Sequence, residues 1–230
     1  MTTSGRGKVA RPKLVGVIVS AADLHVALQM QRPPDLFELR LDSLWPISNR
    51  LEKKFSCLPA PMIVTARDPR EGGAGNLSRP KRLELLERFL PLAKYVDVEL
   101  GLADAFAPLL GDAKKRGVVR ILSYHNFKTT APPRALAARA RAAMAHGADI
   151  FKVATRTDTA AAIARLVDLV TNFHSDVPIS AMGIGKLGPI SRLLLARCGS
   201  VLNYAAITHP NVEGQTSLEL LRSALRHDRM

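Results

Sequence analysis

The segment Ala-Asp-Ile-Phe-Lys-Val-Ala-Thr, residues 148–155, is typical of a short strand buried on both faces. Side chains alternate along a strand, so Ile150, Lys152 and Ala154 share one face. Phe151 and Val153 share the other. A strand that is apolar on both faces usually belongs to a parallel sheet. The segment therefore predicts an α/β fold with a lysine in its interior.

Lys152 is the unusual residue of this segment, because it stands among apolar side chains. Burial disfavours the charged ammonium, which makes the neutral amine more accessible. A neutral amine is a nucleophile suited to forming a Schiff base with a ketone or an aldehyde. The alternative is a lysine at the end of a strand, with its stem buried and its ammonium in water. Taken alone, this alternative is favoured.

Similar strand-like runs occur along the whole chain and alternate with helix-period segments. The predicted strands are 14–20, 36–42, 62–67, 95–100, 120–125, 150–155, 178–183 and 201–207, and the predicted helices are 22–31, 47–57, 79–92, 103–115, 133–146, 158–173, 188–197 and 217–227. Proline and glycine mark the joins. Eight alternations in 230 residues predict a single-domain (β/α)₈ TIM barrel over residues 13–230. Residues 1–12 are predicted to be a basic, flexible tail.

An open doubly wound sheet is the competing architecture. Its support is missing, because no G-x-G-x-x-G motif follows the first predicted strand. The apolar run at residues 14–19 follows several basic residues, as in an export signal, but Asp23 ends it early. We interpret it as the first strand. No apolar run reaches the ~18 residues that a membrane span requires.

The chain is strongly basic, with 33 Lys and Arg against 20 Asp and Glu and a formal net charge of +13. This charge indicates anionic partners, which include nucleic acid, a membrane surface or small carboxylates. We find no RNA-binding motif with interleaved aromatics and no zinc-ligand spacing, so nucleic acid is the minor hypothesis. Two cysteines do not make a disulfide framework, which favours a reducing, cytoplasmic compartment.

Polar residues share one face in several predicted strands. Glu38, Arg40 and Asp42 lie opposite apolar neighbours, as do Thr65 and Arg67, Asp97 and Glu99, and Ser123 and His125. In a barrel these faces point inward and converge near the carboxyl ends of the strands, where such folds carry their active sites. Buried ion pairs that only fix the barrel are the favoured interpretation of Asp42, Asp97 and Glu99. For the set as a whole, titratable groups crowded into one site indicate acid–base chemistry.

These residues carry a pattern that resembles type I 3-dehydroquinate dehydratase, the Schiff-base class of the shikimate pathway. The matching pieces are Glu38-Leu39-Arg40-Leu41-Asp42, Thr65-Ala66-Arg67 with Glu71-Gly72-Gly73, Asp97-Val98-Glu99, Ser123-Tyr124-His125-Asn126-Phe127, Phe151-Lys152-Val153-Ala154, Met182-Gly183, Gly188-Pro189-Ile190-Ser191-Arg192, Gly199-Ser200 and Gly214-Gln215. Each motif is weak alone, but their order over residues 14–225 is specific.

The resemblance implies a (β/α)₈ barrel that dehydrates 3-dehydroquinate to 3-dehydroshikimate without a metal or an organic cofactor. It implies that Lys152 forms the imine with the C3 ketone of the substrate. His125 would remove the C2 proton and later protonate the leaving C1 hydroxyl, and Glu71 would orient His125.

The same resemblance implies the residues that bind the substrate. Arg192 and Gln215 would bind its carboxylate, and Glu38 and Arg67 would hold ring hydroxyls. Further contacts are expected from Arg40, Ser20 and Asn211. Dimerisation is common in the family, so a homodimer is expected. From the apolar runs and motifs above, we expect no membrane partner and regard a nucleic-acid partner as the minor hypothesis.

Two positions depart from the family pattern. Family members usually carry Asp after the catalytic histidine, where this chain has Asn126. Alternation turns Asn126 away from His125, so we expect little effect. Where the family commonly has a Ser/Thr-Ala-Pro-Gly-Gln run, this chain has Asn-Val-Glu-Gly-Gln at residues 211–215. We expect residues 208–216 to form a mobile lid whose closure the charge of Glu213 opposes.

Two alternative functions remain at this point. An aldolase acting on another keto substrate would keep Lys152 but would not need the pair Arg192 and Gln215. A non-catalytic basic barrel that binds nucleic acid or another polyanion would form no imine and would bind in a strongly salt-dependent way.

Overall fold

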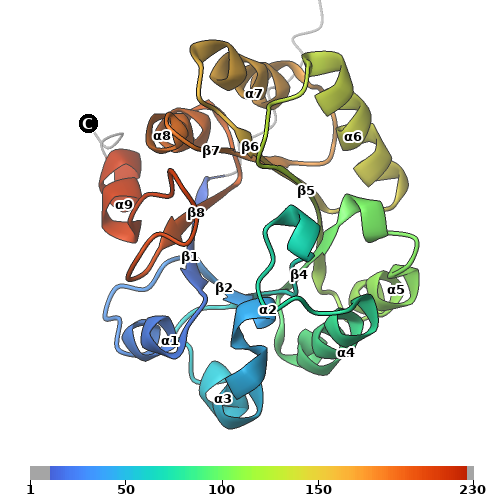
Figure 1. Ribbon diagram of the computed structural model, residues 1–230, viewed down its shortest axis with the longest axis vertical. Coiled ribbons are helices and arrows are strands. Elements are labelled where there is room, and N and C mark those ends of the chain that lie inside the picture. The colour runs from blue at the N-terminus through green and yellow to red at the C-terminus, as the bar shows by residue number, and fades with distance from the viewer. Residues whose placement is uncertain (1–10, 227–230) are drawn as a thin grey trace, which may run out of the picture.

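The computed structural model describes residues 11–226 and forms the predicted (β/α)₈ barrel (Figure 1). Most of the predicted tail, residues 1–10, and the final residues 227–230 lie outside the described residues. The parallel strands are β1 (Lys13–Ile18), β2 (Leu36–Arg40), β3 (Met62–Thr65), β4 (Tyr95–Glu99), β5 (Val119–Asn126), β6 (Ile150–Arg156), β7 (Ile179–Ile184) and β8 (Leu202–Ala206). Their order in the sheet is β7-β6-β5-β4-β3-β2-β1-β8.

The barrel closes between β7 and β8, where a few bonds replace a regular ladder. The backbone nitrogen of Val201, just before β8, donates to the carbonyl of Ile179 at 3.0 Å. The hydroxyl of Ser180 donates to the carbonyl of Leu202 at 2.7 Å. Ser200 spans the same seam, because its hydroxyl accepts from the nitrogen of Ala181 and lies 3.1 Å from that residue's carbonyl. Buried hydroxyls thus complete the ring of strands.

Helices surround the barrel in the order that the sequence predicts (Figure 1). They are α1 (Ala21–Leu28), α2 (Leu41–Leu44), α3 (Ser48–Phe55), α4 (Arg79–Phe89), α5 (Ala107–Lys115), α6 (Pro133–Ala145), α7 (Ala160–Asn172), α8 (Gly188–Cys198) and α9 (Leu218–Arg226), with short 3₁₀ turns η1 (Trp45–Ile47), η2 (Pro69–Glu71), η3 (Leu90–Leu92) and η4 (Leu100–Leu102). The short helix α2 was not predicted. It ends β2 at Arg40, so Asp42 belongs to a helix rather than to the strand.

The two faces of the strands divide the apolar core as predicted. Outward residues such as Phe37, Leu39, Val98 and Val153 are fully buried beneath the helices. A second apolar cluster fills the barrel interior, with Val15, Leu36, Ile63, Ile121 and Ile150 among its members. The cluster also includes Ala154, Met182 and Ile184, which lie nearer the carboxyl ends of their strands, so apolar and polar inward residues meet there.

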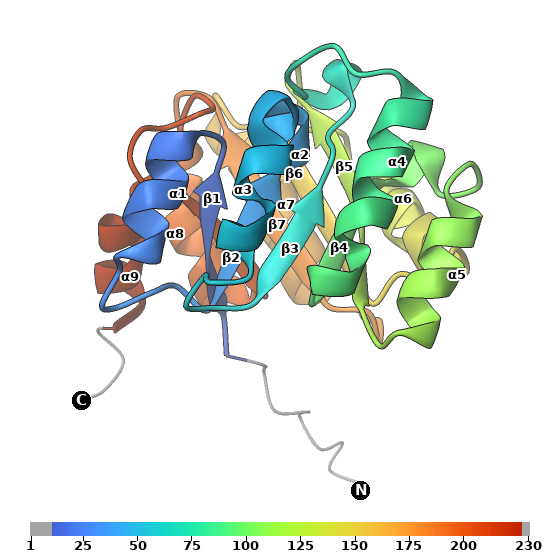
Figure 2. The same ribbon diagram turned by 90° about the horizontal axis from the view of Figure 1, so that it is seen from below.

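The carboxyl ends of the strands all lie at one end of the barrel. Figure 2 shows the arrows of β1 and β3 pointing toward this end, which is at the top of that view. The loops that follow the strands surround it, so functional side chains from distant parts of the chain meet there. Among the described helices, none is both long and apolar enough to cross a membrane.

Candidate active site

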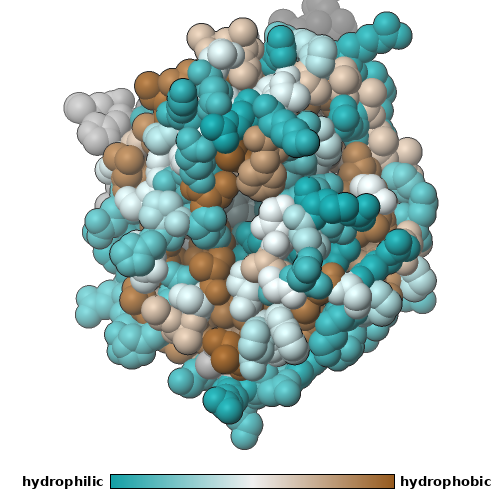
Figure 3. Space-filling model, in the orientation of Figure 1, coloured by the Kyte–Doolittle hydropathy of each residue, from teal (hydrophilic) through white to brown (hydrophobic). Residues whose placement is uncertain are grey.

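A cavity of about 300 Å³ opens at the carboxyl ends of the strands. Figure 3 looks onto this end and shows a hollow near its centre. The lining residues are Val17, Glu38, Arg40, Arg67, Glu71, Gly72, His125, Phe127, Lys152, Ala154, Met182, Ile184, Arg192, Tyr204, Asn211, Val212 and Gln215. The sequence-predicted site residues are therefore brought together, with the exception of Ser20. Its hydroxyl instead caps α1, accepting from the nitrogen of Asp23 at 3.1 Å.

Lys152 lies inside the barrel and is 3% exposed. Its Nζ is 2.9 Å from Asp97 Oδ2 and 3.1 Å from Glu38 Oε1. The two carboxylates come from β4, which is separated from β6 by one strand, and from β2, which lies across the barrel from β6. Lys152 is thus a buried ammonium held by two anions, so the interpretation of a lysine that reaches water at the strand end is wrong.

Asp97 also belongs to a second set of charges. Arg67 Nη2 lies 2.9 Å from Asp97 Oδ1, and the hydroxyl of Ser123 donates to the same oxygen at 2.6 Å. Burial would raise the pKa of Asp97, but the positive charges of Arg67 and Lys152 lower it overall. Asp97 therefore remains ionised beside the lysine. The sequence-based interpretation of Asp97 as a purely structural residue missed this direct contact with Lys152.

His125 and Glu71 form a pair at the cavity wall. Glu71 Oε2 accepts from the backbone nitrogen of His125 at 2.9 Å and lies 2.9 Å from its Nδ1. Burial lowers the pKa of His125 well below 6.5, and the charges of Arg67 and Lys152 lower it further. Burial also raises the pKa of Glu71 to about 7. A neutral imidazole with its Nδ1 engaged leaves Nε2 available as a base.

Glu71 is placed by a loop whose shape depends on buried charges. Asp42 Oδ1 accepts from the nitrogen of Arg67 at 3.2 Å, and Asp42 Oδ2 accepts from that of Ala74 at 2.8 Å. The loop folds back tightly, since a Cβ on Gly73 would stand 2.0 Å from the carbonyl oxygen of Arg67. Asp42 therefore supports the loop rather than the reacting groups.

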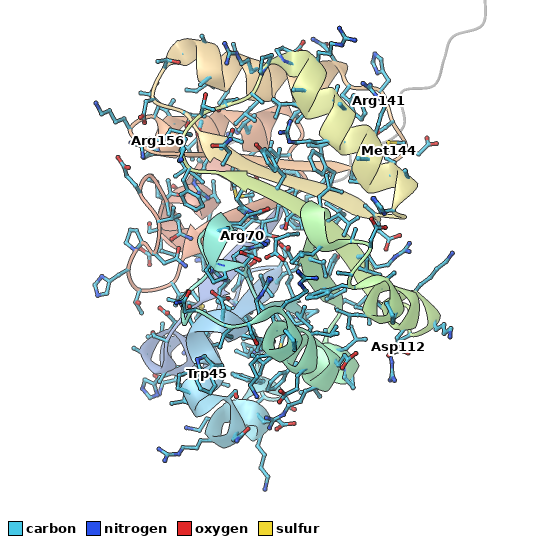
Figure 4. All side chains as sticks on the ribbon, turned by 45° about the vertical axis from the view of Figure 1, so that its right-hand side comes forward. Trp45, Arg70, Asp112, Arg141, Met144 and Arg156 are labelled. Carbon is cyan, nitrogen blue, oxygen red and sulfur yellow. The ribbon has the colours of Figure 1, made fainter. Side chains whose placement is uncertain are left out.

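Arg82 supports the same loop from outside the barrel. It is fully buried on α4, where Nη1 lies 3.1 Å from Glu99 Oε2 and Nη2 lies 2.6 Å from Asp68 Oδ2. Glu99 Oε1 in turn accepts from the nitrogen of Asp68 at 2.8 Å. Figure 4 shows the resulting turn, labelled at Arg70, lying over the end of the barrel. These contacts agree with the prediction that Glu99 forms a buried ion pair that stabilises the fold.

Arg192 offers the cavity a buried cation. It is 4% exposed, and burial lowers its pKa to about 10, so it stays protonated at neutral pH. Its Nη1 donates to the carbonyl of Tyr204 at 2.9 Å and its Nε to that of Gly214 at 3.2 Å. Within residues 11–226 no carboxylate forms a salt bridge with it. A buried guanidinium without an anion is suited to an anionic ligand.

The segment 208–216 covers the cavity beside Arg192. Gln215 Oε1 accepts from the nitrogen of Asn211 at 2.9 Å, which closes a small loop over the cavity. The segment is close to the loop after β7, because a Cβ on Gly214 would stand 2.4 Å from the carbonyl oxygen of Gly185. Asn211 and Gln215 thus reach the cavity from the same short loop.

Glu213 is placed differently from our expectation. Its Oε2 lies 3.0 Å from Arg156 Nη1, and its carbonyl accepts from the nitrogen of Gly185 at 3.0 Å. It does not line the cavity. Figure 4 shows Arg156 at the edge of the barrel mouth, away from the centre. The expectation that Glu213 places its charge at the anion site is therefore wrong, because the carboxylate lies outside the cavity and pairs with Arg156, which Asp158 also contacts at 2.7 Å.

Asn126 and Arg40 stabilise loops around the cavity. Asn126 Oδ1 accepts from the nitrogens of Lys128 and Thr129 at 2.9 and 3.0 Å. Asn126 is not among the residues that line the cavity, which agrees with the direction expected from alternation. Arg40 pairs with Asp42 at 2.8 Å and donates to the carbonyl of Gly72 at 3.1 Å, so it joins α2 to the loop of Glu71.

Several cavity residues were not predicted. The apolar ones, Val17, Phe127, Ala154, Met182, Ile184 and Val212, resemble ordinary core residues in the sequence. Tyr204 is the most notable omission, because its ring centroid lies 3.8 Å from Lys152 Nζ. Alternation along β8 would have placed it inside the barrel, but nothing local in the sequence links it to Lys152.

The chain is similar to known proteins over most of its length. Residues 16–230 match the family model described as type I 3-dehydroquinase. The 3-dehydroquinate dehydratase of Shouchella clausii is 32% identical over 97% of this chain and 92% of its own length. That of Pyrococcus abyssi is 33% identical over 93% of this chain and 97% of its own.

Solved structures resemble the whole barrel. The 3-dehydroquinate dehydratase of Geobacillus kaustophilus superposes with a TM-score of 0.84 at 26% identity, covering 93% of this chain and 90% of that one. The enzyme of Enterococcus faecalis gives a TM-score of 0.82 at 27% identity, covering 96% and 95%.

Proposed function

The chain belongs to the type I 3-dehydroquinase family, and on this premise we propose that it dehydrates 3-dehydroquinate to 3-dehydroshikimate through a Schiff base on Lys152. It is a hydro-lyase by family membership. The reaction belongs to the shikimate pathway, which leads to chorismate and the aromatic amino acids. Lys152 provides the nucleophile, His125 moves the protons, and Arg192 binds the carboxylate.

The first step is the formation of the imine. Lys152 Nζ gives up a proton and adds to the C3 carbonyl, which forms a carbinolamine. The carbinolamine then loses the former carbonyl oxygen as water. Glu38 is the better acceptor for the departing proton, since it forms no salt bridge to an arginine in the described chain. Asp97 is held ionised by Arg67 and keeps the nitrogen in place. A protonated imine then withdraws electrons from the neighbouring C2 more strongly than the ketone does.

The second step is the removal of the C2 proton and of the C1 hydroxyl. Neutral His125 takes the C2 proton on Nε2, while Glu71 accepts a hydrogen bond from the Nδ1–H group and fixes the ring orientation. The electrons form an enamine and then expel the C1 oxygen, which receives the proton from His125 and leaves as water. Hydrolysis of the conjugated imine returns Lys152 and releases the enone.

Binding of the substrate carboxylate orients the ring for both steps. Arg192 supplies a buried positive charge at the wall, and Gln215 and Asn211 approach from the covering loop. Glu38, Arg67 and Arg40 line the opposite part of the cavity, where ring hydroxyls would lie. Closure of residues 208–216 would exclude water and strengthen the contact between the ions.

The observation that carries this proposal is a buried lysine in one cavity with a His–Glu pair and an arginine that no carboxylate of residues 11–226 neutralises. The test is to add 3-dehydroquinate to the purified protein and follow the conjugated enone by its ultraviolet absorbance. A rise in absorbance that depends on protein concentration supports the proposal. An unchanged substrate would refute the activity, and cleavage of a carbon–carbon bond would indicate an aldolase instead.

We also propose, from the family resemblance, that the protein is a cytoplasmic homodimer. The free thiols of Cys57 and Cys198 agree with a reducing compartment. Light scattering of the purified protein tests the assembly, since a mass of 25.0 kDa would indicate a monomer.

A further inference from the structure

Tyr204 contacts the reacting nitrogen but has no part in the steps described above. It lies on β8, is 3% exposed and lines the cavity. Its ring centroid is 3.8 Å from Lys152 Nζ, well within the ~6 Å over which an aromatic face attracts a cation. Its hydroxyl is buried and finds no hydrogen-bond partner within the described chain. The feature that touches Lys152 is therefore the ring and not the phenol group.

The charge on Nζ changes during the reaction that we propose. The nitrogen is positive in the resting ammonium, neutral in the free amine and in the carbinolamine, and positive again in the iminium. The carbinolamine takes up on its hydroxyl the proton that Glu38 received from Lys152 and loses water, and this step places the positive charge on Nζ. A nearby aromatic face stabilises the positive states relative to the neutral ones, and most strongly where water is excluded.

We propose, on the basis of the function proposed above, that Tyr204 is a further catalytic residue whose ring face stabilises the positive charge of the iminium on Lys152. The ring favours the iminium over the neutral carbinolamine and so maintains the electron-withdrawing form of the intermediate. The phenol oxygen takes no part, because burial raises the pKa of Tyr204 well above 10 and keeps the ring neutral.

Other charged groups act on the same nitrogen and must remain constant in a test. Glu38 of β2 and Asp97 of β4 contact Nζ directly, His125 faces it from β5, and Arg67 lies behind Asp97. The carboxylates also stabilise a positive nitrogen. A change at Tyr204 leaves all of these groups in place, so a difference between variants with and without the ring is attributable to the ring.

The experiment compares Tyr204→Phe with Tyr204→Leu. Borohydride reduces the iminium and leaves a stable adduct on Lys152, so the fraction trapped during turnover is measured across a range of pH. We expect Tyr204→Phe to match the unmodified protein. In Tyr204→Leu we expect the trapped fraction to fall at a pH about one unit lower than in the unmodified protein. We also expect kcat to be roughly tenfold lower, with less effect on KM. An unchanged pH dependence of trapping in Tyr204→Leu would overturn the proposal.

A second series covers the case in which Tyr204→Leu fails to fold. Position 204 receives phenylalanine carrying one, two or three ring fluorines, which preserves most of the ring while weakening its negative face. We expect the trapped fraction and kcat to fall stepwise with each fluorine. Equal values across the series would refute the role of the ring. A protein that dehydrates no substrate and traps no adduct with Tyr204 intact would instead refute the proposed function on which this inference rests.

Discussion

One carboxylate oxygen holds His125 in two ways: Glu71 Oε2 lies 2.9 Å from both its backbone nitrogen and its Nδ1. The backbone contact fixes the distance between the loop of η2 and strand β5. The contact with Nδ1 sets the tautomer, because an ionised Glu71 accepts a hydrogen bond from the Nδ1–H group and leaves Nε2 unprotonated. The chemistry of His125 therefore depends on the protonation state of Glu71.

This dependence predicts the acid limb of the pH profile. Burial raises the pKa of Glu71 to about 7. Below that pH the protonated carboxyl donates to Nδ1, which places the ring proton on Nε2 and removes the base. We expect kcat/KM to fall as the pH decreases through about 7. In Glu71→Gln the limb should move down toward the pKa of His125, which lies below 6.5. An unshifted limb would exclude Glu71 as its origin.

Replacement of His125 tests the proton transfer itself. General acid–base catalysis contributes roughly 10²–10⁴-fold, so His125→Ala should lower kcat by about that factor. Imine trapping on Lys152 should survive in part, because the nucleophile and its carboxylates remain. Stopped-flow absorbance measures the first effect and mass spectrometry the second. Near-normal turnover in His125→Ala would contradict the assignment.

Replacement of Arg192 tests the binding of the carboxylate. Loss of a hydrogen bond to a charged group costs ~1.5–3 kcal/mol, so Arg192→Ala should weaken apparent affinity by roughly 10–150-fold. Arg192→Lys keeps the charge but loses the two-pronged geometry, so its apparent affinity should lie between that of the unmodified protein and that of Arg192→Ala. Steady-state KM values at one ionic strength provide the comparison. An unchanged KM in Arg192→Ala would assign the carboxylate to another residue.

The ion pair between Arg156 and Glu213 holds the covering loop against the end of β6, with the two side chains 3.0 Å apart. Glu213→Gln and Arg156→Gln should each raise KM a few-fold, because exposed pairs contribute ~0.2–1 kcal/mol. The double variant should be no worse than Arg156→Gln alone, which also loses the ion pair between Arg156 and Asp158, and added salt should reduce the difference between Glu213→Gln and the unmodified protein. Fully additive effects would show that the two residues act independently.

Much of the site follows from the strand period, which assigns Glu38, Arg67, His125 and Lys152 to the barrel interior without any structure. The same period extended the predicted second strand through Asp42, because no capping residue or other local signal in the sequence indicates the four-residue helix α2. Asp42 therefore appeared to be a strand residue, whereas it holds the loop of Glu71 through backbone nitrogens.

Contacts between side chains of distant elements were beyond the sequence. The expectation for Glu213 considered only the anion site and not Arg156, which lies 57 positions earlier and meets it across the barrel mouth. Ser20 was assigned from its place at a strand end, where a helix cap was the simpler role for a serine. The contact of Tyr204 with Lys152 depends on the closure of the barrel, which places β8 beside β7 and so only one strand away from β6.

Covalent trapping on Lys152 tests the central claim most directly. Sodium borohydride is added to the protein during turnover of 3-dehydroquinate, and the modified peptide is sequenced by mass spectrometry. The account predicts one reduced adduct, located on Lys152, which is absent without substrate and absent in Lys152→Arg. Full dehydratase activity with no adduct on Lys152, or with the adduct on another lysine, would contradict it.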